Sequence, residues 1–304
     1  MVKTFPDSQL GLALGINATS WVIGAIIGPV VGGILITQFG WRSIFFVTVP
    51  FVFICIIGAV LLCVTFIITE LHVENPLFNL NLLSYRKYSI GLGITLCYCI
   101  AYFSLPLLLS VYLQSALHLS PTMSGVLMIS LSVPQLILGP FAGKVVDYMG
   151  SVKTLSLGII FLIIGIFMLG NLGSQLSIPT IVTPLILLSI ANSLAWPSLS
   201  KTVLSAVPKE QSGSASGMQY TIMNVGKALS QTFAILTIEV SIPADAVSKA
   251  IIGIGNLNSI NISGNLVSSI DSSFRFFTVF FVVALMLSLI LLYSKDKILT
   301  SLEK

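Results

Sequence analysis

The stretch between residues 211 and 239 carries a lysine and several amide and phenol groups inside an otherwise apolar run. Lys227 lies near its middle, and the residues on its helix face or beside it are Gln219, Tyr220, Met223, Asn224 and Gln231. A lysine that faces lipid costs about 2.5–3.5 kcal/mol, so Lys227 should face inward. The pattern predicts a cavity wall in which Lys227 is the counter-ion of a carboxylate, and a substrate role is a separate hypothesis. Its central position argues against a lysine that snorkels toward a helix end.

Other polar and aromatic side chains in apolar runs are candidates for the same cavity: Asn17, Tyr98, Tyr102, Phe103, Gln135, Asn192 and Trp196. An unpaired polar group in hydrocarbon costs several kcal/mol, so the helices that carry them should surround an interior. Aromatic walls with few polar groups suit hydrophobic compounds, cationic ones included. Each of these residues taken alone is more often a packing residue than a ligand contact.

Catalysis inside a membrane needs paired aspartates, a serine with a histidine, or a metal-binding HExxH pattern, and the sequence contains none of these. His72 and His118 are isolated, and there is no glycine-rich phosphate cradle with a lysine. The cysteines form no CxxC pattern and are read as small packing residues: Cys55, Cys63, Cys97 and Cys99. We therefore predict a protein that is not an enzyme and that has neither a cofactor nor a metal.

The composition excludes a water-soluble globule. Of the 304 residues 56% are hydrophobic and 8% are charged, whereas soluble domains carry about 25% charged residues. The net charge of +4 is too small and too scattered to indicate a nucleic-acid partner. Because a span needs about 20 apolar residues, eight stretches are expected to cross the lipid bilayer: 10–37, 44–69, 88–113, 122–142, 153–172, 178–199, 211–239 and 274–294. The sequence predicts an all-α membrane protein.

Lysine and arginine beside the spans indicate orientation, because they stay on the cytoplasmic side. If the N-terminus is inside, ten of them fall on inner segments: Lys3, Arg86, Lys87, Lys144, Lys153, Lys201, Lys209, Lys295, Lys297 and Lys304. Three fall on outer segments: Arg42, Lys249 and Arg275. We therefore predict a multi-pass protein of the cell membrane with both termini in the cytoplasm.

The spans differ in character. Those at 44–69, 153–172 and 274–294 are almost uniformly apolar, which predicts peripheral helices that face lipid on most sides. With the spans placed in this way, the hydrocarbon core holds no aspartate or glutamate, and Glu239 lies at an outer helix end.

The first span carries glycines four residues apart, followed by a proline: Gly24, Gly28, Pro29, Gly32 and Gly33. The spacing puts Gly24, Gly28 and Gly32 on one helix face, where a neighbouring backbone can approach closely, and Pro29 bends the helix. On spacing alone the favoured interpretation is a packing seam between helices.

The chain also repeats itself at an offset of 202 residues. PDSQLGLALGINATSWVIG at 6–24 matches PKEQSGSASGMQYTIMNVG at 208–226 at seven of nineteen positions, three of which are glycine. These spans are six apart, so the repeat unit holds six helices of the same orientation, as in the parallel halves of major facilitator transporters. Counting back from the first span, four helices are expected to be missing before Met1.

The glycine motif with its continuation, GAIIGPVVGGILITQFGWRSIFFVTVP, resembles the antiporter motif of the fifth helix in major facilitator drug exporters. Trp41-Arg42 and Pro50 further resemble the drug:proton antiporter branch, which usually has fourteen spans. ELHVENPLFNLNLLSYRKYS resembles the segment that enters the seventh helix of that branch. The resemblance implies that the glycine motif seals the outward gate, and that the carboxylates for proton coupling belong to the absent helices.

A second motif, Gly143-x-x-x-Asp147-x-x-Gly150-x-x-Lys153, is expected in a short cytoplasmic loop between the spans at 122–142 and 153–172. It resembles the second-half copy of the facilitator loop motif, with Tyr148 and Ser151 where basic residues are common. The resemblance implies that Asp147 docks near the start of the first span, at about 8–12, and latches the cytoplasmic gate. The alternative is a turn residue among ordinary inside charges.

The predicted organisation is the last two helices of an N-terminal half at 1–72, a cytoplasmic connector at 73–87, and a six-helix C-terminal half at 88–304. This is a major facilitator-type bundle that lacks its first four helices. The resemblance implies a proton-coupled exporter of drugs or small hydrophobic or amphipathic compounds by alternating access. The alternative is a non-transporting truncated product, or a subunit whose partner supplies four helices.

Overall fold

The computed structural model describes residues 80–172, 178–240 and 260–302, with isolated positions at 39, 46, 49, 50 and 58. The chain divides into two compact units, Met1–Leu77 and Phe78–Lys304, and only the second can be described as a fold. The predictions for Asn17, for the glycine motif at 24–33 and for the repeat segment at 6–24 lie outside the described residues and stay predictions. So do most residues of the spans predicted at 10–37 and 44–69.

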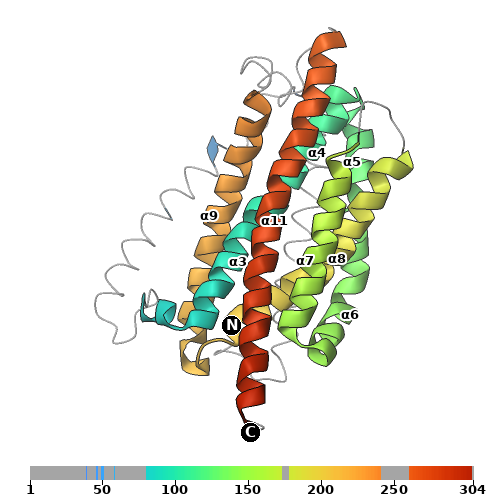
Figure 1. The fold of residues 1–304 in the computed structure, drawn as a ribbon. Helices are drawn as coiled ribbons and strands as arrows, with labels where there is room; N and C mark the ends of the chain where they lie inside the picture. Colours follow the sequence, from blue (N-terminus) through green and yellow to red (C-terminus); the bar gives the residue numbers. More distant parts are fainter. Residues whose placement is uncertain are drawn as a thin grey trace. The chain divides into compact units, whose positions relative to one another are not determined.

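The second unit is a bundle of helices, and the described residues form no strand, which confirms the all-α prediction (Figure 1). The α-helices are α3 (Arg86–Tyr102), α4 (Leu105–Val111), α5 (Pro121–Ile129), α6 (Val133–Met149), α7 (Ser151–Leu169), α8 (Ile178–Leu204), α9 (Ser212–Glu239) and α11 (Ile260–Leu302). The short elements are the 3-10 helices η1 (Leu80–Ser84) and η3 (Lys209–Gln211) and the π-helix η2 (Tyr112–Ala116).

Four segments of the described chain are long and apolar enough to cross a membrane: Arg86–Ala116, Ser151–Leu169, Ile178–Leu204 and Leu266–Tyr293. A fifth is broken, because Met123–Gly139 and Phe141–Met149 meet at a bend of 62°. The predicted span at 211–239 is the helix α9. Its polar residues lower its mean hydropathy, so α9 is not among these candidate spans.

Small residues set the closest helix contacts of the unit. A Cβ built on Gly158 of α7 would lie 2.9 Å from the Cβ of Ala195 on α8, so these two backbones nearly touch. A Cβ built on Gly226 of α9 would lie 2.7 Å from the Cβ of Cys99 on α3. Membrane helices associate through such close packing, because lipid tails are as apolar as leucine.

Three spans were predicted to be peripheral. The one at 44–69 lies almost entirely outside the described residues, and burial separates the other two, α7 and α11. In α11, 28% of the most apolar window is buried, which agrees with a helix at the edge of the unit. In α7 the share is 50%, the same as in α8. The prediction of a peripheral α7 is therefore wrong, because Gly158 and Gly165 let α8 cover one side of it.

Candidate functional site

The centre of the bundle holds an aromatic and amide cluster between α3 and α8. The hydroxyl of Tyr98 on α3 donates a hydrogen bond to Oδ1 of Asn192 on α8, and both side chains are buried. The ring of Tyr98 lies 5.7 Å from that of Tyr102 and 5.9 Å from that of Trp196, between centroids. The structure thus brings together four of the residues predicted for the cavity, in a packed arrangement that satisfies the polar groups.

Gln135 joins this region through its backbone. It lies in the first turn of α6, where helical N–H groups have no partner within their own helix. Its N–H donates to Oγ of Ser189 on α8, at 2.9 Å. The backbone of Gln135 therefore anchors the start of α6 on the helix that carries Asn192, and the Gln135 side chain is half-buried.

The polar residues of α9 are divided between two faces of the helix. Gln219 and Met223 are buried in the bundle, on the side that also holds Gly226. Tyr220 is 58% exposed, and Asn224 is exposed on the same side. The exposed polar residues of this side continue along the helix, and we call them the open face of α9: Tyr220, Thr221, Asn224, Gln231 and Thr232.

Lys227 lies at the margin between these two faces and is half-buried. Its Nζ lies 4.6 Å from the centroid of the Phe103 ring, which follows directly after α3. Such a contact stabilises an ammonium by about 0.5–2 kcal/mol. Cys99 on α3 lies within electrostatic reach of Lys227, since Gly226 brings the two helices together at this level. The ammonium is therefore held against the wall formed by α3 rather than extended toward a helix end.

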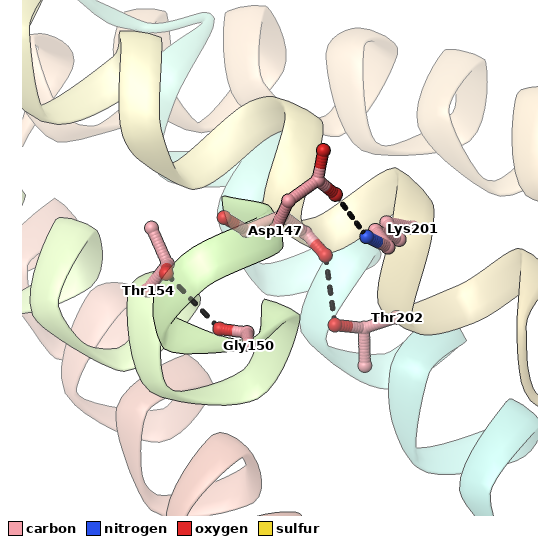
Figure 2. Close-up of polar contacts among 6 residues, drawn as sticks. Asp147, Gly150, Thr154, Lys201 and Thr202 are labelled. Atoms are coloured by element: carbon pink, nitrogen blue, oxygen red, sulfur yellow. Dashed lines mark hydrogen bonds and ion pairs between the residues drawn. The ribbon is translucent and has the colours of Figure 1, made fainter. Parts of the chain in front are cut away.

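The predicted gate motif lies mostly in helices. Gly143 and Asp147 belong to α6 and Lys153 belongs to α7, so the expected loop is reduced to Gly150. The backbone of Gly150 has a φ of 87°, which favours glycine. The hydroxyl of Thr154 donates to the carbonyl oxygen of Gly150 at 3.0 Å and fastens the joint, as Figure 2 shows.

Asp147 forms an ion pair within this unit, with Nζ of Lys201 near the end of α8, at 2.5 Å (Figure 2). A carboxylate in the last turn of its own helix meets the negative end of the helix dipole, and Lys201 offsets this. The side chains of Lys201 and Asp147 are 50% and 72% exposed, so the pair contributes only about 0–1 kcal/mol. The predicted contact of Asp147 with residues 8–12 lies outside the described residues.

The sequence analysis did not identify a set of polar contacts between the first half of α11 and the residues that follow α7. Arg275 on α11 donates from Nε to the carbonyl oxygen of Gly170 at 3.1 Å, and from Nη2 to Oδ1 of Asn171 at 3.0 Å. Asp271, one turn earlier, has a buried Oδ1 and interacts electrostatically with Tyr112 of η2. A π-helix such as η2 often marks a functional position.

The last candidate span begins earlier than the predicted 274–294, and Asp271 lies near its start. The candidate span runs from Leu266 to Tyr293, and both Asp271 and Arg275 lie within it. The prediction of 274–294 began too late, because the serine-rich sequence before it did not look like a continuing helix. The sequence does indicate a longer helix, since there is no glycine or proline between residues 265 and 302.

These observations define a polytopic helical membrane protein with a polar helix face and a buried aromatic and amide cluster. The sequence profile of the Major Facilitator Superfamily matches the chain over residues 1–231 and again over 90–299. The chain belongs to the major facilitator superfamily, whose members are transport proteins and not enzymes.

Three curated relatives are similar to this chain. The multidrug resistance protein Stp of Mycobacterium tuberculosis is 24% identical, over 76% of this chain and 53% of its own length. The riboflavin transporter RibZ of Clostridioides difficile is 22% identical, over 76% of this chain and 61% of its own length. The lincomycin resistance protein LmrB of Listeria innocua is 21% identical, over 76% and 60%. The chain spans about half to three fifths of the length of these relatives.

Proposed function

We propose that this chain forms part of a proton-coupled exporter of small hydrophobic or amphipathic compounds that works by alternating access in the cell membrane. The proposal includes both termini in the cytoplasm. The observation that carries it is the open face of α9, with Lys227 at its margin. The exposed phenol of Tyr220 and the exposed amides of Asn224 and Gln231, along a helix of 28 residues, are poorly suited to lipid.

The physical argument concerns what this face can contact. The hydroxyls of Thr221 and Thr232 donate to carbonyl oxygens one turn earlier in α9, so the argument concerns the phenol of Tyr220 and the amides of Asn224 and Gln231. Each polar group left unsatisfied in hydrocarbon costs several kcal/mol, so these three groups favour contact with water, a polar ligand or another polar protein surface. In transporters built from two related halves, the substrate site lies between the halves near the middle of the membrane. The open face of α9 is therefore assigned to the substrate pathway.

The names of the relatives support the substrate class. Two of them are named for resistance to drugs, and one is named as a riboflavin transporter. For this chain we propose organic compounds with both apolar and polar parts, because a wall of aromatic rings with a few amides suits them. Export and proton coupling rest on the resemblance of the glycine motif to that of drug:proton antiporters.

A second candidate function is that of a subunit or a product that does not transport alone. The observation that favours it is length, since the chain covers 53% of Stp and 61% of RibZ. Alternating access requires two halves that rock about a central site. A polypeptide with fewer helices than such a pair would need a partner to supply them.

The test is transport of a fluorescent amphipathic dye into inside-out vesicles that contain only this chain, energised by a pH gradient. Proton-coupled export predicts dye uptake that an ionophore abolishes and that Lys227→Ala removes. Lys144→Ala is the matched control, because Lys144 is an exposed lysine at the far end of α6. Uptake that depends on co-expression of a four-helix segment would favour the subunit. Robust uptake that ignores Lys227→Ala would discard the site.

A further inference from the structure

A groove opens between α7 and α8, at the end of α7 that is far from Gly150. The two helices run side by side (Figure 1), and α7 ends at Leu169, which is also the last residue of a candidate membrane span. The groove has a volume of about 490 Å³, and six residues line it: Phe167, Met168, Asn171, Pro179, Thr180 and Thr183. It therefore lies where α7 leaves the hydrocarbon, with Phe167 and Met168 on the side of the bilayer core.

A positive charge lies beside this groove, level with the end of α7. Nη2 of Arg275 on α11 donates to Oδ1 of Asn171 at 3.0 Å, and Asn171 is one of the lining residues. The amide nitrogen of Asn171 donates in turn to the carbonyl oxygen of Phe167 at 2.8 Å, which fixes the amide at both ends. With the bond from Nε to Gly170, contacts inside the described part of the chain engage two of the five guanidinium N–H groups. Arg275 is exposed, so its other donors can meet an acceptor at the membrane surface.

The nearest acidic residue on α11 has other neighbours. Asp271 lies one turn earlier than Arg275, but its Oδ1 is buried and it interacts electrostatically with Tyr112 of η2. The guanidinium of Arg275 is held instead against the end of α7. Asp271 lowers the net charge of this region, so an anion should gain at most what one basic side chain gives.

We infer that this groove binds an anionic phospholipid, whose phosphate pairs with Arg275 and whose acyl chain packs against Phe167 and Met168. A guanidinium donates two parallel hydrogen bonds to a phosphate, and this pairing is strong at the edge of the hydrocarbon. Phe167 is 57% exposed and Met168 is 38% exposed, so both offer apolar surface to a chain that continues into the bilayer. A zwitterionic headgroup carries its own cation next to the phosphate, which would meet the like charge of Arg275. Charge complementarity therefore favours a lipid such as phosphatidylglycerol.

A hydroxyl group in the groove also suits the polar part of a lipid. Threonines elsewhere in these helices donate to a carbonyl oxygen one turn earlier, as Thr154, Thr202 and Thr221 do. Thr183 is exposed in the groove and makes no such bond to Pro179, the described residue one turn before it. Its hydroxyl can donate to a glycerol ester, which lies between the phosphate and the acyl chain of a phospholipid.

The test is photocrosslinking in nanodiscs of phosphatidylcholine that contain a known minority of phosphatidylglycerol, with no gradient and no transported compound. A p-benzoylphenylalanine replaces Phe167 in the groove or, as a reference, Met286 on the exposed side of α11. Mass spectrometry then gives the ratio of the two lipids attached at each position. We expect phosphatidylglycerol to be enriched about fivefold at position 167 relative to position 286, the effect of one basic side chain near anionic lipid.

Three variants separate the groove from general attraction to the membrane. Arg275→Met should remove the enrichment at position 167, and Arg275→Lys should retain part of it. Arg86→Met removes another exposed arginine of the unit, at the start of α3, and should leave the enrichment unchanged. If Arg275→Met fails to fold, Thr183→Trp fills the groove without touching the bonds of Arg275 and should also remove the enrichment.

The outcomes are distinct from those of the transport test, because lipid binding needs neither a substrate nor a gradient. Equal lipid ratios at positions 167 and 286 overturn the inference. So do an enrichment that survives Arg275→Met or Thr183→Trp, and crosslinking at position 167 to protein instead of lipid. A chain that moves no dye but shows the enrichment retains the lipid site and removes only transport by this chain alone.

Discussion

Substitution of Gly226 by alanine should separate α9 from α3 at the level of Lys227. The new methyl carbon would lie 2.7 Å from the Cβ of Cys99 and 3.3 Å from the carbonyl oxygen of Leu96. Carbon atoms pack best at about 3.5–4.0 Å, so the helices must move apart by about 1 Å. Neither neighbour can rotate away, because one is a backbone atom and the other is a Cβ. Overpacking of this kind costs about 1–3 kcal/mol.

Two matched variants separate the clash from the general effect of alanine. Gly125 of α5 has no described atom within 4 Å of a built Cβ, so Gly125→Ala should be neutral or stabilising by about 0.5–1 kcal/mol through helix propensity. Cys99→Gly removes the atom that clashes. In a Gly226→Ala background it should therefore recover about 1–3 kcal/mol relative to its effect in the wild type.

The assay is unfolding of the purified protein in mixed micelles with increasing dodecyl sulfate, followed by circular dichroism. A loss of 1.4 kcal/mol corresponds to a tenfold change in the unfolding equilibrium constant, which such titrations resolve. The reasoning is refuted if Gly226→Ala unfolds at the same dodecyl sulfate fraction as Gly125→Ala. It is equally refuted if Cys99→Gly destabilises both backgrounds by the same amount, since the two residues would then not be in contact.

Substitutions at three other contacts have defined expected outcomes in the same unfolding assay. Tyr98→Phe should cost about 1–3 kcal/mol, because it leaves the buried Oδ1 of Asn192 without its donor, and Asn192→Leu in the same chain should recover part of that loss. A double-mutant cycle of Asp147→Asn and Lys201→Met should give a coupling energy below about 1 kcal/mol that falls with added salt; a larger value would mean that the pair is less exposed than the structure has it. Arg275→Met should cost about 1 kcal/mol through its two lost hydrogen bonds to the end of α7, and no change in stability would rule out that contact in solution.

The sequence predicts the helices of this unit well and their ends less well. Long apolar runs identify each span, because only helices satisfy their own backbone groups in lipid. The runs do not identify where a helix stops, since a helix continues into water when no residue breaks it. For this reason α11 extends over Ile260–Leu302 where 274–294 was expected, and α6 continues to Met149 where a loop was expected.

The site was predictable as a set of residue types but not as a set of contacts. Tyr98 and Asn192 were both identified as polar groups at membrane depth, yet their hydrogen bond joins residues 94 positions apart and depends on packing. In α9 the polar residues lie on two sides of the helix, so periodicity alone could not tell which side is buried. The contact of Gly226 with Cys99 determines which side of α9 is buried, because it turns Gln219 inward and leaves Tyr220 exposed.

The central claim is that the open face of α9 lines a polar, water-accessible pathway. It is tested most directly by single cysteines at Tyr220, Asn224 and Gln231, and at Val279 and Met286 on the exposed side of α11, each reacted in membranes with a charged, impermeant thiol reagent. The account predicts that the three α9 positions react readily and that the two α11 positions react only with a lipid-soluble reagent. Equal resistance of the α9 and α11 positions to the charged reagent would contradict it.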